Sequence, residues 1–195
     1  MRVSRFFACL IGEEENSEHK KVAPKLIKKC LDIKETIESG GSNWLFNTYN
    51  TQSTYNICKD KDFEQINKFV SNAVKNYCEE NRLDFSKVEN YPSDGWLNVY
   101  KKGDSQEFHQ HRMSIISAVY YLKAPPNSAK FYIKSPYQDM LNPNITEATF
   151  DNTHIAHIQP VAGTVIVFRS YLEHMVEQQQ TDDERISLAY NFYKA

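Results

Sequence analysis

The sequence contains no long hydrophobic run and carries almost no net charge. No stretch reaches the roughly 18 consecutive apolar residues of a transmembrane helix, and the apolar run from Phe6 to Ile11 is too short for a signal peptide. The formal net charge is −2 and the isoelectric point is about 6.3. Such a balance gives no general attraction to nucleic acid or to anionic membranes. We therefore expect a cytoplasmic protein whose partners include neither a membrane nor a nucleic acid.

Cysteine and glycine are also scarce. The four cysteines, Cys9, Cys30, Cys58 and Cys78, are widely and irregularly spaced and form no CxxC pair. This pattern indicates reduced thiols in a reducing compartment rather than a disulfide framework. The six glycines among 195 residues, together with 41% hydrophobic and 25% charged residues, exclude a fibrous or disordered chain.

Aromatic residues are abundant, and they favour β structure. The chain has 12 Tyr and 11 Phe, and both residue types are enriched in strands. A chain of this length buries roughly 70% of its surface on folding. No linker divides the sequence, so we expect a single domain over residues 1–195, with a helical support region at 1–90 and a β-rich core at 91–195.

The first part of the chain predicts one strand and two helices. The strand is expected at Arg2–Ile11. Apolar residues recur every three or four positions from Val22 to Glu38 and again from Lys61 to Glu80, as on one face of a helix. Asp62 with Gln65 resembles a capping box at the start of the second helix. The aromatic stripe of this helix is expected to pack against a sheet rather than to bind a cofactor.

The chain after Tyr91 predicts short strands separated by turn signals. This pattern is typical of a sandwich or jelly roll, so the expected fold is α+β but mainly β, a double-stranded β-helix (jelly roll) core with the N-terminal helices packed outside. The long polar stretch Tyr137–Asp151 would form a lip over a site. The expected strands are Trp96–Lys101, Glu107–Arg112, Ile115–Lys123, Lys130–Ser135, His154–Gln159, Thr164–Arg169, His174–Gln179 and Arg185–Tyr193.

Two histidines in this half are separated by a single residue. Residues two apart point to the same face of a strand, so His109 and His111 would lie side by side. Their rings could then share one metal ion at roughly 2.0–2.2 Å each, with a third ligand from a distant strand. An HxH pair by itself is a weak signal, since a single histidine is more often a surface residue or a hydrogen-bonded core residue.

The order and spacing of several motifs together resemble a known family. The motifs are WLNVY at 96–100, Gly103, HQH at 109–111, SAVYYL at 117–122, PVAGTVIVF at 160–168, LEH at 172–174 and RISLAYNF at 185–192. They span about half of the chain, and this half resembles the core of the non-haem iron, 2-oxoglutarate-dependent oxygenases. The resemblance is closest to the phage and bacterial branch related to the prolyl hydroxylases.

The resemblance implies a metal site. In the family, two ligands from one strand and a distant histidine hold Fe(II) on one face, which leaves positions for 2-oxoglutarate and O₂. By this resemblance the ligands here are His109, His111 and His174, whereas His154 and His157 match no family role and are expected not to be ligands.

The resemblance also implies a site for the co-substrate 2-oxoglutarate. Arg185 takes the place of the family's basic residue for the distal carboxylate, which a guanidinium can bind through two parallel hydrogen bonds. Ser187 shares the strand face of Arg185 and could donate a further hydrogen bond. Tyr100 and Tyr121 match positions whose phenols bind the same molecule. Each of the four also has a structural interpretation: a surface ion pair for Arg185, barrel filling for Tyr100 and Tyr121, and a plain strand residue for Ser187.

One residue departs from the family pattern. The usual triad is HxD or HxE with a distant histidine, and His111 occupies the carboxylate position. Three neutral imidazoles leave the metal with one negative charge fewer, which raises the question of whether Fe(II) or Zn(II) is native. Glu107 is an alternative carboxylate ligand, because it shares a strand face with His109.

These features predict an enzyme that couples oxidative decarboxylation of 2-oxoglutarate to hydroxylation of an unactivated C–H bond. Its substrate would be a small molecule or a peptide. Two alternatives stay open at this point. One is a non-enzymatic jelly-roll binding or structural protein that contains a metal, and the other is a cupin-type metalloenzyme that needs no 2-oxoglutarate.

Overall fold

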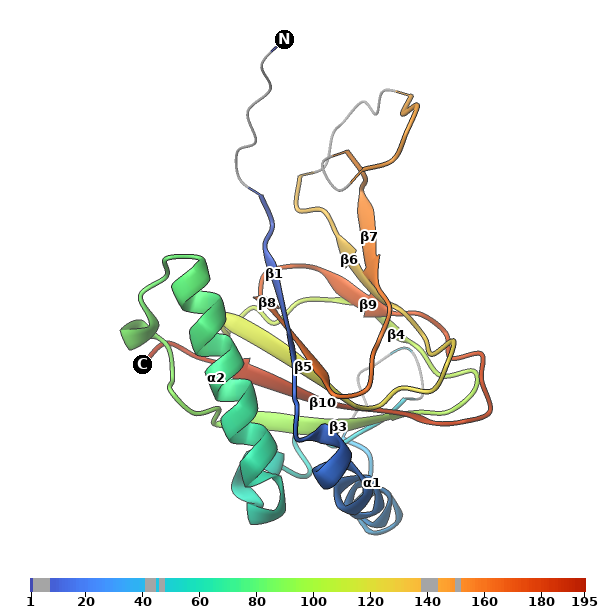
Figure 1. The fold of residues 1–195 in the computed structure, drawn as a ribbon. Coiled ribbons are helices and arrows are strands. Elements are labelled where there is room, and N and C mark those ends of the chain that lie inside the picture. Colours follow the sequence, from blue (N-terminus) through green and yellow to red (C-terminus); the bar gives the residue numbers. More distant parts are fainter. Residues whose placement is uncertain (2–7, 41–44, 46–47, 138–143, 150–151) are drawn as a thin grey trace.

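Two antiparallel sheets and two long helices make up the part of the chain that the computed structural model describes, which is residues 1, 8–40, 45, 48–137, 144–149 and 152–195 (Figure 1). The elements are β1 (Ile11–Glu15), α1 (His19–Thr36), β2 (Tyr49–Asn50), α2 (Glu64–Glu80), β3 (Asp94–Tyr100), β4 (Gln106–His109), β5 (Ile116–Lys123), β6 (Phe131–Lys134), β7 (Ile155–Ile158), β8 (Thr164–Arg169), β9 (His174–Val176) and β10 (Arg185–Phe192). Short 3₁₀ turns lie at Ile57–Lys59, Lys61–Phe63 and Phe85–Lys87. None of the described helices is long and apolar enough to cross a membrane.

The two sheets form the predicted jelly roll. The major sheet has the strand order β1-β8-β5-β10-β3-β2, and the minor sheet has the order β4-β9-β6-β7. Helices α1 and α2 pack on the major sheet, on the face away from the minor sheet (Figure 1). The expectation of a mainly β core with the helices outside it is therefore confirmed.

Two apolar layers result, one on each face of the major sheet. Alternate residues of β10, such as Ile186, Leu188 and Tyr190, pack under the helices. The intervening residues Arg185 and Ser187 point toward the minor sheet and line a pocket between the sheets. Because side chains alternate along a strand, the polar residues of β10 face the minor sheet and its large apolar residues face the helices.

The predicted strands of the β-rich half agree closely with the observed ones. Thr164–Arg169 is observed as β8 without change, and β10 ends one residue earlier than expected. The strand expected at Glu107–Arg112 differs most, because β4 ends at His109 and a register irregularity interrupts its pairing with β9. His111 therefore follows the strand instead of lying on it. The proposed lip at Tyr137–Asp151 includes 138–143 and 150–151, which lie outside the described residues.

The first strand is displaced from its expected position. It was expected at Arg2–Ile11, of which 2–7 lie outside the described residues, but β1 runs from Ile11 to Glu15. β1 thus includes the three glutamates at 13–15, which lie beyond the expected strand. As an edge strand, β1 pairs only with β8, so one of its faces can carry acidic side chains in contact with water.

The second helix begins differently from the expected capping box. Residues Lys61–Phe63 form a 3₁₀ turn before α2 begins at Glu64, and the cap is Asp60, whose carboxylate accepts from the backbone N–H of Asp62 at 2.9 Å. The side chain of Asp62 turns outward and binds Lys25 at 2.6 Å and Lys29 at 3.2 Å. The prediction that Asp62 and Gln65 form the cap was therefore wrong, because the side chain of Asp62 forms ion pairs with two lysines of α1 instead.

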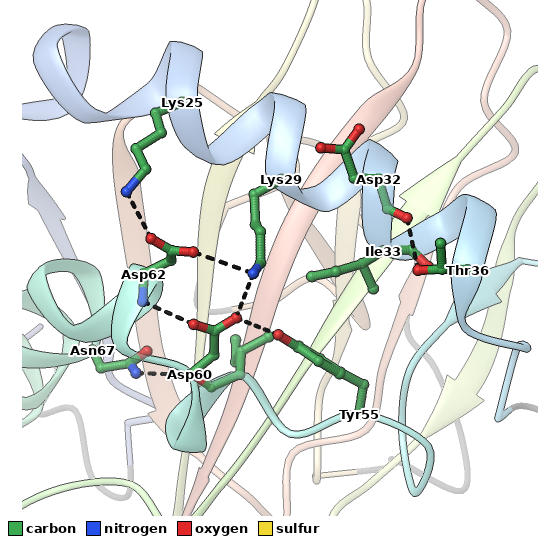
Figure 2. Close-up of polar contacts among 10 residues, drawn as sticks. Lys25, Lys29, Asp32, Ile33, Thr36, Tyr55, Asp60, Asp62 and Asn67 are labelled. Carbon is green, nitrogen blue, oxygen red and sulfur yellow. Dashed lines mark hydrogen bonds and ion pairs between the residues drawn. The ribbon is translucent and has the colours of Figure 1, made fainter.

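Asp60 is the centre of a polar network that joins α1 to the segment before α2 (Figure 2). Besides capping the turn, its carboxylate accepts a hydrogen bond from the Tyr55 hydroxyl and pairs with Lys29 at 3.0 Å. These contacts hold the pKa of Asp60 below its usual value against the opposing effect of burial. The network therefore ties α1 to the 3₁₀ turn that leads into α2.

We expect Asp60→Ala to lower the free energy of unfolding by about 2 kcal/mol, since it removes a helix cap and a half-buried ion pair. The matched control is Asp32→Ala on the exposed side of α1, where Asp32 pairs only with Lys28 through its side chain. That change should cost less than about 0.5 kcal/mol. Urea denaturation of both variants makes the comparison, and equal losses would contradict the role given to Asp60.

Candidate metal centre and the adjoining pocket

Three histidines from two stretches of the chain converge between the sheets. His109 is the last residue of β4 and His174 the first residue of β9, and the two are direct partners in the sheet. His111 follows β4, and its backbone N–H donates to the carbonyl of Ser170 at 3.0 Å. One potential ligand atom from each ring lies within 4.8 Å of the other two, so the three imidazoles can share one metal ion.

The second nitrogen of each ring is held by an oxygen acceptor. Nδ1 of His109 lies 2.8 Å from the backbone oxygen of Glu107, and Nδ1 of His174 lies 2.8 Å from that of Leu172. Nδ1 of His111 lies 2.7 Å from Oδ1 of Asn191. Because these oxygens can only accept, each Nδ1 carries the proton and each Nε2 carries the lone pair. This is the tautomer that a metal ligand requires.

Burial keeps the three rings neutral. Desolvation lowers the pKa of His109 and, together with the neighbouring ring of His109, lowers the pKa of His111 to about 4. His174 is 3% exposed, and its pKa lies well below the ordinary value for the same reasons. Phe131 and Phe168 pack on this last ring, with centroids 5.2 and 4.9 Å away. Neutral imidazoles are ready to bind a cation near pH 7.

A buried arginine lies in the same pocket. Arg185 is 0% exposed, and its Nε and Nη1 have no hydrogen-bond partner among the described residues. Its guanidinium carbon lies 4.6 Å from the ring centroid of Tyr100 and 5.2 Å from that of Tyr121. An unpaired buried charge is costly to a folded protein, and aromatic rings compensate for only part of the cost. The structure thus excludes a surface ion pair as the explanation for Arg185.

The other three predicted pocket residues surround Arg185. Tyr100 and Ser187 line the same pocket as the histidines, and Tyr100 is the β3 partner of Arg185. Tyr121, the β5 partner of Ser187, lies behind the guanidinium. The Tyr121 hydroxyl is buried and makes no hydrogen bond of ordinary geometry, and burial raises the pKa of this phenol although Arg185 opposes the shift.

The remaining candidates lie outside this arrangement. The Glu107 carboxylate accepts from the backbone N–H of Leu45 at 2.9 Å and from the Gln106 side chain at 3.0 Å. It is not among the groups that converge with the three histidines. His154 and His157 belong to the hairpin of β6 and β7 and are not part of the cluster either, and the ring of His157 packs near that of Tyr132.

Sequence reasoning missed two residues that support the site. Asn191 binds His111, and Trp96 lies beside it with a ring centroid distance of 5.6 Å. The signal was available, because period two along β10 and β3 places Asn191 on the face of Arg185 and Trp96 on the face of Tyr100. Both residues lie within the motifs WLNVY and RISLAYNF, but these motifs alone do not predict a contact with the histidines.

The donor set and the pocket fit a divalent metal and an anionic co-substrate. Three neutral imidazole nitrogens suit first-row divalent metals, and the two unpartnered guanidinium nitrogens suit a carboxylate. A jelly roll that places both in one pocket defines the class of mononuclear non-haem metal oxygenases that use a keto acid.

Comparison with known proteins agrees with this class. A family model described as "Putative 2OG-Fe(II) oxygenase", where 2OG is 2-oxoglutarate, matches residues 94–191, from the first residue of β3 to the second-last residue of β10. The chain belongs to this family of 2-oxoglutarate- and Fe(II)-dependent oxygenases. None of the curated proteins compared with the chain matches it.

Solved structures share the fold. The prolyl-4-hydroxylase of Pseudomonas putida is 16% identical, with a TM-score of 0.63 over 94% of this chain and 93% of its own. A prolyl hydroxylase from Trichoplax adhaerens, in complex with a peptide of hypoxia inducible factor, is 14% identical, with a TM-score of 0.64 over 94% and 83%. HygX from Streptomyces hygroscopicus, with nickel, 2-oxoglutarate and hygromycin B bound, is 8% identical, with a TM-score of 0.59 over 95% and 83%.

The metal-free protein should lose stability in mild acid. The pKa of His111 is about 4 in the folded protein and 6.5 ordinarily, so between these values the unfolded chain binds protons that the folded protein does not. The free energy of unfolding should therefore fall as the pH is lowered from about 6.5 toward about 4. Urea denaturation with a chelator present measures this slope. His111→Gln should reduce it, whereas His157→Gln, at an exposed position, should leave it unchanged, and equal slopes in all three proteins would contradict the assignment.

Proposed function

We propose that this oxygenase hydroxylates a C–H bond of a peptide or small molecule, with Fe(II) held by Nε2 of His109, His111 and His174. In this proposal the distal carboxylate of 2-oxoglutarate binds Arg185. Bound iron supplies the redox chemistry, in which O₂ and 2-oxoglutarate are converted to succinate and CO₂ while one oxygen atom enters the C–H bond. The protein contributes binding, orientation and the exclusion of water.

The observation that carries the proposal is the buried guanidinium in the pocket of the three histidines, whose Nε and Nη1 have no hydrogen-bond partner among the described residues. A purely structural jelly roll would gain nothing from a buried cation without an anion. A cupin-type metalloenzyme that needs no keto acid would have no use for it either. Both alternatives therefore leave Arg185 unexplained, whereas a dicarboxylate co-substrate neutralises it.

The residues around Arg185 divide the binding of the co-substrate between them. Tyr100 and Ser187 flank the guanidinium from β3 and β10, where their hydroxyls can hydrogen bond the same carboxylate. The orphaned hydroxyl of Tyr121 gains a partner in the same way. Because Arg185 and the three histidines line one pocket, the keto acid end of a 2-oxoglutarate bound to Arg185 would be available to the metal.

The pocket selects an uncharged part of the substrate. Apart from the histidines and Arg185, the described residues that line it carry no ionisable side chain other than the phenol of Tyr100, and they include Trp96 and the carboxamides Asn50 and Gln52. A charged group would enter without a partner and pay the full desolvation cost. Neutral groups are available both in peptides and in small molecules, the two kinds of ligand present in the Trichoplax adhaerens and Streptomyces hygroscopicus structures.

Anaerobic addition of Fe(II) and then 2-oxoglutarate should produce a visible charge-transfer band in the wild-type protein, because keto acid and iron meet in one site. His174→Ala removes the ligand buried deepest, so the band should disappear and iron affinity should fall by at least about tenfold. His157→Ala, on the outer hairpin, should retain both. A band that survives in His174→Ala would refute the proposed ligand set.

Arg185→Met should separate binding from stability. Without ligand, the variant should unfold at the same temperature as the wild type or at a higher one, because an unpaired buried cation has been replaced by an apolar chain. With Zn(II) and 2-oxoglutarate at about 100 times its dissociation constant, the wild type should gain roughly 2.7 kcal/mol, and the variant should gain nothing from 2-oxoglutarate. Thermal unfolding measures both quantities.

The matched control for this prediction is Arg169→Met. Arg169 also has a buried Nε that finds no hydrogen-bond partner in the described part of the chain, but it does not line the pocket. This variant should keep the full response to 2-oxoglutarate. A response retained in Arg185→Met would contradict the role of Arg185.

A further inference from the structure

A chain of hydrogen bonds links the metal-binding cluster to a carboxylate outside it. Oδ1 of Asn191 accepts from Nδ1 of His111 at 2.7 Å, and Nδ2 of the same side chain donates to Oδ2 of Asp94 at 3.1 Å. The Tyr193 hydroxyl donates to the same carboxylate oxygen at 3.0 Å. Asp94 begins β3, and Asn191 is its direct partner in β10.

The carboxylate determines which way the Asn191 amide points. If the amide were reversed, its oxygen would face the Asp94 carboxylate, and two acceptors would oppose each other. With the amide as it is, its oxygen faces His111 and also accepts from the hydroxyls of Ser114 and Ser117, both at 3.2 Å. The amide oxygen then obliges His111 to carry its proton on Nδ1, which leaves Nε2 for the metal.

His111 is also the position where the family pattern has a carboxylate. The three imidazoles bring no negative charge to a divalent ion. Among the described residues, the Asp94 carboxylate is joined to the ring of His111 through side-chain hydrogen bonds. An anion that accepts from an amide makes the amide oxygen a stronger acceptor, and this in turn makes the imidazole a stronger donor of electrons to a metal.

We infer that Asp94, acting through Asn191, supplies beside the metal ligands the negative charge that a carboxylate ligand at position 111 would carry and that His111 lacks. Asp94 and Asn191 are thus positioning residues for the metal, and the inference rests on the proposed function. Glu107 does not offer the same route, because its carboxylate binds Leu45 and Gln106 and reaches His109 only through a main-chain carbonyl.

Two substitutions separate the effect of the Asp94 charge from the effect of the hydrogen-bonded link through Asn191. Asp94→Asn removes the charge but keeps an oxygen that can accept from Asn191 and Tyr193. Asn191→Leu removes the link at similar volume. The control for Asp94→Asn is Glu89→Gln, which neutralises another carboxylate at this end of the sheet, one that binds Ser93 and the backbone N–H of Tyr193. The control for Asn191→Leu is Asn67→Leu, which changes a fully buried asparagine that binds Ile57 and Tyr190.

The measurement uses Co(II) alone, without 2-oxoglutarate or O₂. Its affinity is obtained by competition with a chelator, and the visible absorption of bound Co(II) reports the ligand field. Asp94→Asn should weaken binding about tenfold and shift the absorption, and Asn191→Leu should weaken it about 10- to 100-fold, the range for outer-shell partners of metal-bound histidine. Glu89→Gln and Asn67→Leu should stay within about twofold of the wild type, even where Asn67→Leu lowers the unfolding temperature.

Three outcomes would overturn the inference. Unchanged affinity and absorption in both Asp94→Asn and Asn191→Leu would show that the outer shell does not act on the metal. A loss in Asn191→Leu alone would show that only the orientation of His111 matters and that the charge of Asp94 does not. A wild type that binds Co(II) no better than His174→Ala would refute the proposed metal site itself, and the inference with it.

Discussion

Strand β10 has no face in contact with water, and this constraint determines how the rest of the molecule is arranged. Every residue from Arg185 to Phe192 is buried. The large apolar side chains on one face require a cover, which α1 and α2 provide, and the polar side chains on the other face require partners inside the molecule. β3 and β5 close both edges of the strand. The pocket between the sheets is therefore formed by the same packing that buries the core.

Much of this could be predicted from the sequence, because alternation along a strand is a local property. β8 and β10 were predicted within one residue, and the face shared by Arg185 and Ser187 follows from period two alone. Features that depend on distant partners could not be predicted. The edge position of β1, where exposed glutamates are tolerated, depends on its pairing with β8, which is distant in the chain, and Asn191 meets His111 across 80 residues of sequence. His111 lies close to His109, as expected, although β4 has already ended and the pair is not held by strand geometry.

The buried guanidinium illustrates how a binding site costs stability. Arg185 is the largest fully buried side chain of the described protein, and two aromatic rings are its main neighbours. A sequence selected for stability alone would place an apolar residue here. Under the proposed function, the position instead keeps a charge whose partner would be a carboxylate of 2-oxoglutarate from solution.

The direct pairing of His109 with His174 has a consequence for the integrity of the minor sheet. Both strands are short, four residues in β4 and three in β9, and their pairing is irregular. A metal bound to both residues would act as a cross-link between segments that are distant in the chain, and such a cross-link removes loop entropy from the unfolded state. The strands that carry the ligands would then be fastened by the ion they hold, so that loss of the ion loosens the sheet as well as emptying the site.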